Sequence, residues 1–208
     1  MRNTARSALL VVVLSAAALL PGCVTRPITT VEMSWVTPQL PQAPFNQLLI
    51  ISVAADDFVQ IEFQDQMAAA LKARGMNAVA SKAYFTINTD AARARFRKTI
   101  DDSGADYVLV AHTTGRDKKS RDDRFMTFGD ATGLYTGYDR YVSSARSASD
   151  YSSESLTSEV SIFKVQGERL IWSARIRTEN PKVMRGEDYA PLYVAVVLEA
   201  MKKDKLLN

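Results

Sequence analysis

The chain has 208 residues, of which 47% are hydrophobic and 24% charged, which suits one folded domain with a substantial core. Its net charge is only +3, and two of those charges are Arg2 and Arg6 at the amino terminus. So small an excess argues against a nucleic-acid-binding protein, which needs a strongly basic surface. A single cysteine excludes an intrachain disulfide, so the fold must be held together by packing.

The amino terminus has the layout of a secretory signal. Arg2 and Arg6 precede an apolar stretch, 8–20, which only Ser15 interrupts. This stretch is shorter than the ~20 residues that a transmembrane helix needs. We therefore expect a cleaved export signal and not a membrane span.

The cleavage region is more specific than the apolar stretch. Leu20-Pro21-Gly22-Cys23 resembles the lipobox of bacterial lipoproteins, in which Leu and two small residues precede an invariant Cys. The resemblance implies residues 1–22 as signal peptide and a lipidated Cys23 whose acyl chains anchor the protein in a membrane. Val24 follows where Asp would retain the protein at the inner membrane, which points to the periplasmic face of the outer membrane. The alternative is an ordinary secreted protein whose one cysteine stands there by chance.

Residues 23–46 are predicted to form a lipidated tether. Four prolines and few charges indicate an extended chain, and about 20 such residues would reach ~60 Å. Val31, Met33 and Trp35, however, alternate with polar residues, which is the period of a half-buried strand. An edge strand over 31–35 is an equal alternative.

Residues 47–208 are predicted to form a single α/β domain. The expected elements are a buried strand over 48–53, a helix from Asp56-Asp57 to Gly75, a strand over 77–80, a helix from Thr89 or Asp90 to Gly104, and a strand over 107–111. Short connections between strands and helices predict parallel pairing, because parallel strands need helical crossovers. The second helix should bury Ala92, Phe96 and Ile100.

The second half of the domain begins with a predicted Gly-, Ser- and Tyr-rich loop over 115–150. A hairpin follows, in which paired residue numbers must sum to an even value if Val160 and Ile162 are to share a face with Leu170 and Trp172. This requires a three-residue loop or a bulge at Gly167, and it predicts a buried Trp172. A carboxyl-terminal helix from Glu187 or Asp188 completes a mixed sheet of about five strands, in order β-α-β-α-β-β-β-α, with helices packed on it and a tendency to three layers.

Little in the sequence favours catalysis. His112 is the one histidine, and with no other His or Cys in the mature chain it lacks the partners of a metal site or a catalytic triad. Phosphate-binding and nucleophile-elbow motifs are absent from the sequence. We therefore predict no catalytic residues, no metal and no cofactor, and a structural role for His112. A hydrolase-type enzyme remains the rival class.

Two surfaces are candidate binding sites. The first is the aromatic set of the 115–150 segment, a composition typical of recognition loops: Phe125, Phe128, Tyr135, Tyr138, Tyr141 and Tyr151. The equal alternative is a loop folded back on the sheet with its tyrosines partly buried. The second is the cationic face of the helix after residue 89, which could contact anionic envelope material or form an ordinary solvated face: Arg93, Arg95, Arg97 and Lys98.

Several strings resemble one group of envelope lipoproteins. These are 70–75 (ALKARG), 103–110 (SGADYVLV) and 167–173 (GERLIWS), together with the closing helix. They are similar to the penicillin-binding-protein activator LpoB, the curli secretion lipoprotein CsgG and the amino-terminal domain of TolB. The resemblance implies a non-catalytic recognition module that binds an envelope protein partner. The alternative is a homo-oligomeric component of an envelope assembly or secretion system.

Overall fold

The computed structural model describes residues 27–38, 40, 45, 47–54, 57–117, 133–147, 155–179 and 186–207. The predicted signal peptide, Cys23, Phe125, Phe128 and Tyr151 lie outside these residues. Nothing below therefore bears on them directly.

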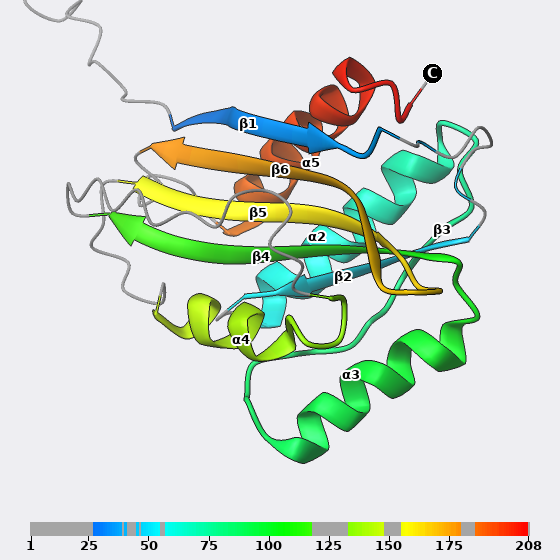
Figure 1. Cartoon of the computed structure of the whole chain (residues 1–208). Coiled ribbons are helices and arrows are strands. Elements are labelled where there is room, and N and C mark those ends of the chain that lie inside the picture. Colours follow the sequence, from blue (N-terminus) through cyan, green and yellow to red (C-terminus); the bar gives the residue numbers. More distant parts are fainter. Residues whose placement is uncertain are drawn as a thin grey trace, which may run out of the picture.

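The chain forms one six-stranded mixed sheet with helices on both of its faces (Figure 1). The elements are β1 (Ile28–Val36), β2 (Leu48–Val53), α2 (Asp57–Lys72), β3 (Ala78–Ala80), α3 (Asp90–Ser103), β4 (Tyr107–Asp117), α4 (Tyr138–Ser147), β5 (Ser155–Lys164), β6 (Arg169–Glu179) and α5 (Gly186–Lys203). The sheet order is β1-β6-β5-β4-β2-β3, in which β2 pairs in parallel with β3 and β4 while the other pairs are antiparallel. The predicted α/β class, with helices packed on a mixed sheet, is confirmed.

Two hydrophobic cores lie on the two faces of the sheet. The first packs α2 and α5 against the sheet and contains Trp172, whose side chain is fully buried as predicted and whose indole N–H donates to Asp204 at 2.8 Å. The second packs α3 and α4 on the opposite face around Phe85 and Phe96. The three-layer arrangement follows from strands that are buried on both faces, as β2 is along its whole length.

Strand β1 is an edge strand, so the alternative of an edge strand over 31–35 is confirmed and the tether is shorter than 23–46. It runs over Ile28–Val36 and pairs antiparallel with β6, with a bulge between Val31 and Met33. The ordered domain therefore begins well before residue 47. Between Cys23 and the start of β1 only residues 24–27 remain.

The β5–β6 hairpin follows the predicted register in its body but not at its turn. From Ile162↔Trp172 outward the paired numbers have an even sum, as expected. Near the turn Phe163 pairs with Leu170, an odd sum, and Glu168 donates its N–H to the Val165 carbonyl at 3.1 Å. A bulge at Ile171, and not at Gly167, restores the even register. As a result Leu170 packs against the second core, whereas Trp172 lies in the first.

Helix α4 lies inside the segment that was predicted to be a loop. Tyr138, Tyr141, Val142 and Ala145 recur at the spacing of one helical face, and all four are buried in the second core. The loop prediction for 115–150 is therefore wrong for 138–147 and also for 115–117, which extend β4.

Candidate functional site

The segment between β3 and α3, residues 81–89, is irregular in conformation but firmly held. Gln60 and Gln64 of α2 are fully buried and bind its backbone: Phe85 N–H donates to Gln60 Oε1 at 3.2 Å and Lys82 N–H donates to Gln64 Oε1 at 2.8 Å. Gln64 Nε2 also donates to the Ala83 carbonyl at 3.2 Å. Two side chains one helical turn apart thus supply hydrogen-bond partners to backbone groups that lie outside the sheet.

Lys82 shows that this segment is strained. Its φ is +58°, in the left-handed region that non-glycine residues seldom adopt. The bond from its N–H to Gln64 and its ion pair with Asp65 hold it there. Such strain persists only where surrounding contacts determine the conformation, and it is common at functional sites.

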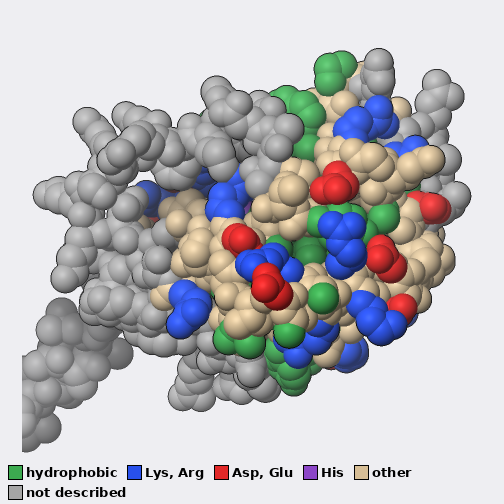
Figure 2. Space-filling view, turned by 60° about the horizontal axis from the view of Figure 1, so that its bottom comes forward, with side chains coloured by type: hydrophobic (Ala, Val, Ile, Leu, Met, Phe, Trp, Pro, Cys, Tyr) green, Lys and Arg blue, Asp and Glu red, His purple; other side chains and the backbone are tan. Residues whose placement is uncertain are grey.

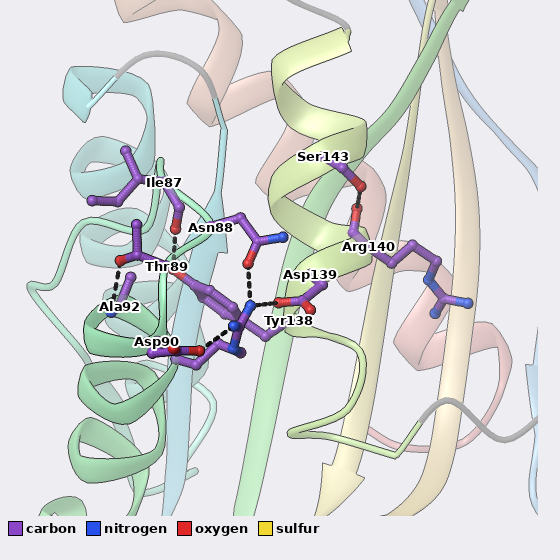
Figure 3. Close-up of polar contacts among 10 residues, drawn as sticks. Ile87, Asn88, Thr89, Asp90, Ala92, Tyr138, Asp139, Arg140 and Ser143 are labelled. Carbon is purple, nitrogen blue, oxygen red and sulfur yellow. Dashed lines mark hydrogen bonds and ion pairs between the residues drawn. The ribbon is translucent and has the colours of Figure 1, made fainter.

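Helix α4 holds the other end of the segment. Tyr138 is 1% exposed, and its hydroxyl donates to the Ile87 carbonyl at 2.9 Å (Figure 3). Burial is the main cause that raises the pKa of the Tyr138 hydroxyl, which keeps it protonated as a donor. Arg93 of α3 then bridges to α4 through Asp139 at 2.8 Å, and it also contacts Asn88 and Asp90 (Figure 3).

Two apolar side chains project from this fixed backbone. Tyr84 is 44% exposed and Ile87 is 50% exposed. We call Tyr84 and Ile87, together with Arg93 and Arg95, which donate to Asn88 and to the Tyr84 carbonyl, the 81–89 surface. On the face of the molecule that α3 and α4 form, cationic and acidic side chains interleave with separate hydrophobic ones and do not gather into one charged patch (Figure 2).

The four predicted cations of α3 are all engaged within the molecule. Arg93 has the partners given above, Arg95 donates to the Tyr84 carbonyl, Arg97 lies 4.1 Å from the centroid of the Tyr135 ring, and Lys98 pairs with Asp102 at 2.7 Å. An external anion would have to compete with these contacts. The contact with anionic envelope material stays a prediction.

The three predicted tyrosines that the structure describes divide into two kinds. Tyr138 and Tyr141 are each 1% exposed, so the expectation that they present their rings to a partner is corrected: both are core residues. Tyr135 is half-buried, and its hydroxyl donates to Asp101 at 2.9 Å. Burial, with that hydrogen bond, raises the pKa of Tyr135 to about 12. Tyr135 alone of the three stands at the surface.

His112 is a poor candidate for chemistry. It is 3% exposed in the middle of β4, and its ring centroid lies 4.6 Å from that of Tyr141. Burial lowers its pKa from 6.5 to about 4, although Glu159 acts in the opposite direction. His112 Nδ1 has no hydrogen-bond partner among the described residues, so no carboxylate or carbonyl orients the imidazole through that nitrogen, as a general base would require.

A shallow hollow lies at the end of β2 and beside the middle of β4, on the side of α2 and α5. Its lining includes Val53, Phe63, His112, Tyr189 and Tyr193. The Tyr193 hydroxyl donates to the Ser158 hydroxyl at 2.6 Å, so its proton is already used within the molecule. Among the described residues no three His, Cys, Asp or Glu side chains come together to hold a metal, and none of the described helices is long and apolar enough to cross a bilayer.

Sequence reasoning missed the residues that build this surface. Gln60 and Gln64 are polar residues at i and i+4 of α2, so they lie on one flank of the helix. That spacing is the signal in the sequence that could have identified them. Tyr84 and Ile87 carried no signal, because isolated apolar residues in an irregular segment are equally often buried.

Comparison with known proteins gives a distant structural likeness. No protein-family model matches the chain, and no curated protein matches it. A solved structure of the PelC dodecamer from Paraburkholderia phytofirmans is similar with a TM-score of 0.43 and 12% identity, over 84% of this chain and 95% of that one. A single-substitution variant of that PelC dodecamer gives a TM-score of 0.42 and 14% identity, over 82% and 96%.

Proposed function

We propose that this chain is a lipid-anchored module on the periplasmic face of the outer membrane that binds a protein partner through the 81–89 surface and performs no chemistry. The anchoring rests on the lipobox resemblance at Cys23. The binding role rests on the structure of residues 81–89.

One observation carries the binding role: Tyr84 and Ile87 are exposed on a backbone that Gln60, Gln64 and Tyr138 hold from below. Binding loses free energy when loops must be ordered, so a segment already fixed in place binds at lower entropic cost. Tyr and Arg are also the residues that dominate binding energies at protein interfaces. Tyr84 is one of the two exposed side chains, and Arg93 and Arg95 lie beside them, since they donate to Asn88 and to the Tyr84 carbonyl.

The second candidate function is a homo-oligomeric component of an envelope assembly or secretion system. The observation that favours it is the open sheet, whose two edges are β1 and β3. An unpaired edge is a template for pairing with another chain, and pairing of unlike edges generates rings or filaments. The dodecamers of PelC belong to that protein and add no argument here.

Paired variants test the main proposal. Tyr84→Ser with Ile87→Ser removes two exposed apolar side chains, and Ala195→Ser on the exposed side of α5 is the control. If each lost side chain contributes about 2 kcal/mol of binding, the complex should weaken by about a thousandfold. The readout is the native mass of the complex extracted from membranes in mild detergent, with the melting temperature of each variant measured beside it.

We expect the double variant to melt like the unsubstituted protein and to lose the heavier species, while the control keeps it. A heavier species that survives the double variant would contradict the 81–89 surface as the binding site. A mass that is a whole multiple of this one chain, unchanged in the double variant, would support the homo-oligomer instead.

A further inference from the structure

The folded domain begins very close to the lipidated residue. Only residues 24–27 separate Cys23 from Ile28, the first residue of β1. At most ~3.6 Å per residue, the two Cα atoms can lie no more than about 18 Å apart. A domain of this size has a radius of gyration of about 16 Å, so the connection is shorter than the domain is wide.

Strand β1 presents one row of side chains away from the first core. Thr30, Met33 and Trp35 pair with Arg177, Arg175 and Ser173 of β6, which alternate along that strand and so share a face. Because the bulge between Val31 and Met33 inserts one residue, Ile28 and Thr30 before it lie in the same row as Met33 and Trp35 after it. Val31 and Val36 lie in the other row and pack against the first core. We call Ile28, Thr30, Met33 and Trp35 the β1 strip.

The β1 strip is apolar and accessible. Ile28 is 55% exposed and Met33 is 43% exposed, although both belong to a strand at the edge of the sheet. Trp35 is half-buried in the same row, and a Trp flanked by apolar residues suits the boundary between headgroups and acyl chains. Arg177 lies beside the strip but faces Glu32 and Glu179, each at 3.8 Å, so charge supplies no net attraction to anionic lipid.

We propose that the β1 strip lies on the lipid headgroups, so that the sheet is tilted toward the membrane on the side of the strip, with its β1 edge at the surface and its β3 edge away from it. This inference rests on the proposed anchoring at Cys23. The acyl chains hold the domain at the surface, and the short connection brings β1 to it. Lying flat, the strip places Ile28 and Met33 at the headgroups together. If the strand stood upright, Met33 would be about 16 Å further out than Ile28.

The opposite edge of the sheet offers a matched control. Val79 of β3 is 41% exposed, close to the 43% of Met33, and it also lies away from the α2 and α5 face, since it pairs with Leu49 of the second core. Five strand spacings separate β1 from β3, which is about 24 Å. Two positions of equal exposure thus differ in their distance from the proposed membrane surface.

The experiment uses the lipoprotein after cleavage before Cys23, with no other truncation, in vesicles of phosphatidylethanolamine and phosphatidylglycerol. Met33→Cys and Val79→Cys each introduce the one free thiol, because the lipidated Cys23 sulfur is a thioether. A nitroxide on that thiol reports its collision rate with a water-soluble nickel chelate, and intact mass establishes lipidation. We expect the collision rate to be several-fold lower at position 33 than at position 79.

The failures of the two proposals are distinguishable. Equal collision rates in protein of lipidated mass would overturn the β1 strip and leave the anchor intact. Spin–spin broadening at position 33 would mean that the labels of two chains lie close together. It would overturn the membrane contact of the β1 strip in favour of a second copy of the chain on the β1 edge. Protein of mature mass without acyl chains would overturn the anchoring itself.

Discussion

At the scale of single residues, burial decides what each polar side chain can do. His112 is enclosed between the sheet and α4, where the neutral imidazole is favoured because the charged form loses its hydration. As the one histidine of the chain, His112 is the side chain that a general base would most readily use, and the sequence predicted a structural role for it because it lacks partners. Its surroundings make it a neutral core residue at the pH of most cells.

His112 should make stability depend on pH. Its folded pKa of about 4 lies below the 6.5 of the unfolded chain, so between these values the unfolded state binds the extra proton. The free energy of unfolding should therefore fall as pH decreases from 6.5 to 4, by roughly 3 kcal/mol at about 1.4 kcal/mol per pKa unit. Urea unfolding at a series of pH values measures this.

His112→Gln is the control, because glutamine keeps a polar side chain but does not titrate. The variant should be less sensitive to pH in that window, whatever its absolute stability. Parallel curves for the two proteins would show that His112 is not the group responsible.

Tyr138 and Tyr84 should respond oppositely to the same substitution. Tyr138→Ser removes a ring that is 1% exposed and a hydrogen bond to Ile87, and large-to-small changes in a core cost about 3–5 kcal/mol. Tyr84→Ser removes a ring that is 44% exposed and should change stability by less than about 0.5 kcal/mol. Thermal or urea unfolding compares them. Equal losses in the two variants would contradict the assignment of Tyr138 to the second core.

At the scale of elements, the irregular 81–89 segment depends on α2. Gln60→Met and Gln64→Met keep the length of each side chain but remove the acceptors of the Phe85 and Lys82 amides. Those two amides should lose protection from hydrogen exchange, each in its own variant, while amides of α3 keep theirs. Gln66→Met is the matched control, since Gln66 bonds to Glu62 on the same helix and not to the segment. Unchanged exchange at Lys82 in Gln64→Met would mean that the segment is held by other contacts.

Elements with a clear hydrophobic period could be predicted from the sequence. Elements whose residues suit both a helix and a binding loop could not. Helix α3 was located from Thr89 to Gly104 because an N-cap and a left-handed glycine enclose a clear apolar face. Helix α4 was missed although Tyr138, Tyr141 and Val142 have helical spacing, because tyrosines among Ser and Gly also suit a recognition loop. The hairpin register followed from side-chain alternation, but alternation alone cannot place the bulge at Ile171.

The candidate site was less predictable than the fold, for a physical reason. Tyr84 and Ile87 owe their exposure to Gln60, Gln64 and Tyr138, which lie in other elements and contact the segment only in the folded chain. A local pattern cannot report such long-range bonds. One member of the predicted aromatic set does contact the segment, since the Tyr138 hydroxyl donates to the Ile87 carbonyl.

At the scale of the whole molecule, the proposals assign different parts of one sheet to different tasks. The β1 edge follows Cys23 directly and is proposed to face lipid, while the 81–89 segment follows β3 at the other edge. A partner bound there would meet the domain at the side furthest from the membrane. The order of strands thus separates anchoring from recognition.

In-cell photo-crosslinking tests the central claim, protein binding through the 81–89 surface, most directly. A photoreactive residue at Ile87 samples this surface, and one at Glu199, exposed on α5 across the sheet, is the control. We predict an adduct at Ile87 with a second, different protein, lost when Tyr84→Ser is added, and no such adduct at Glu199. Folded, membrane-bound protein that gives no adduct at Ile87, or the same adducts at both positions, would contradict the account.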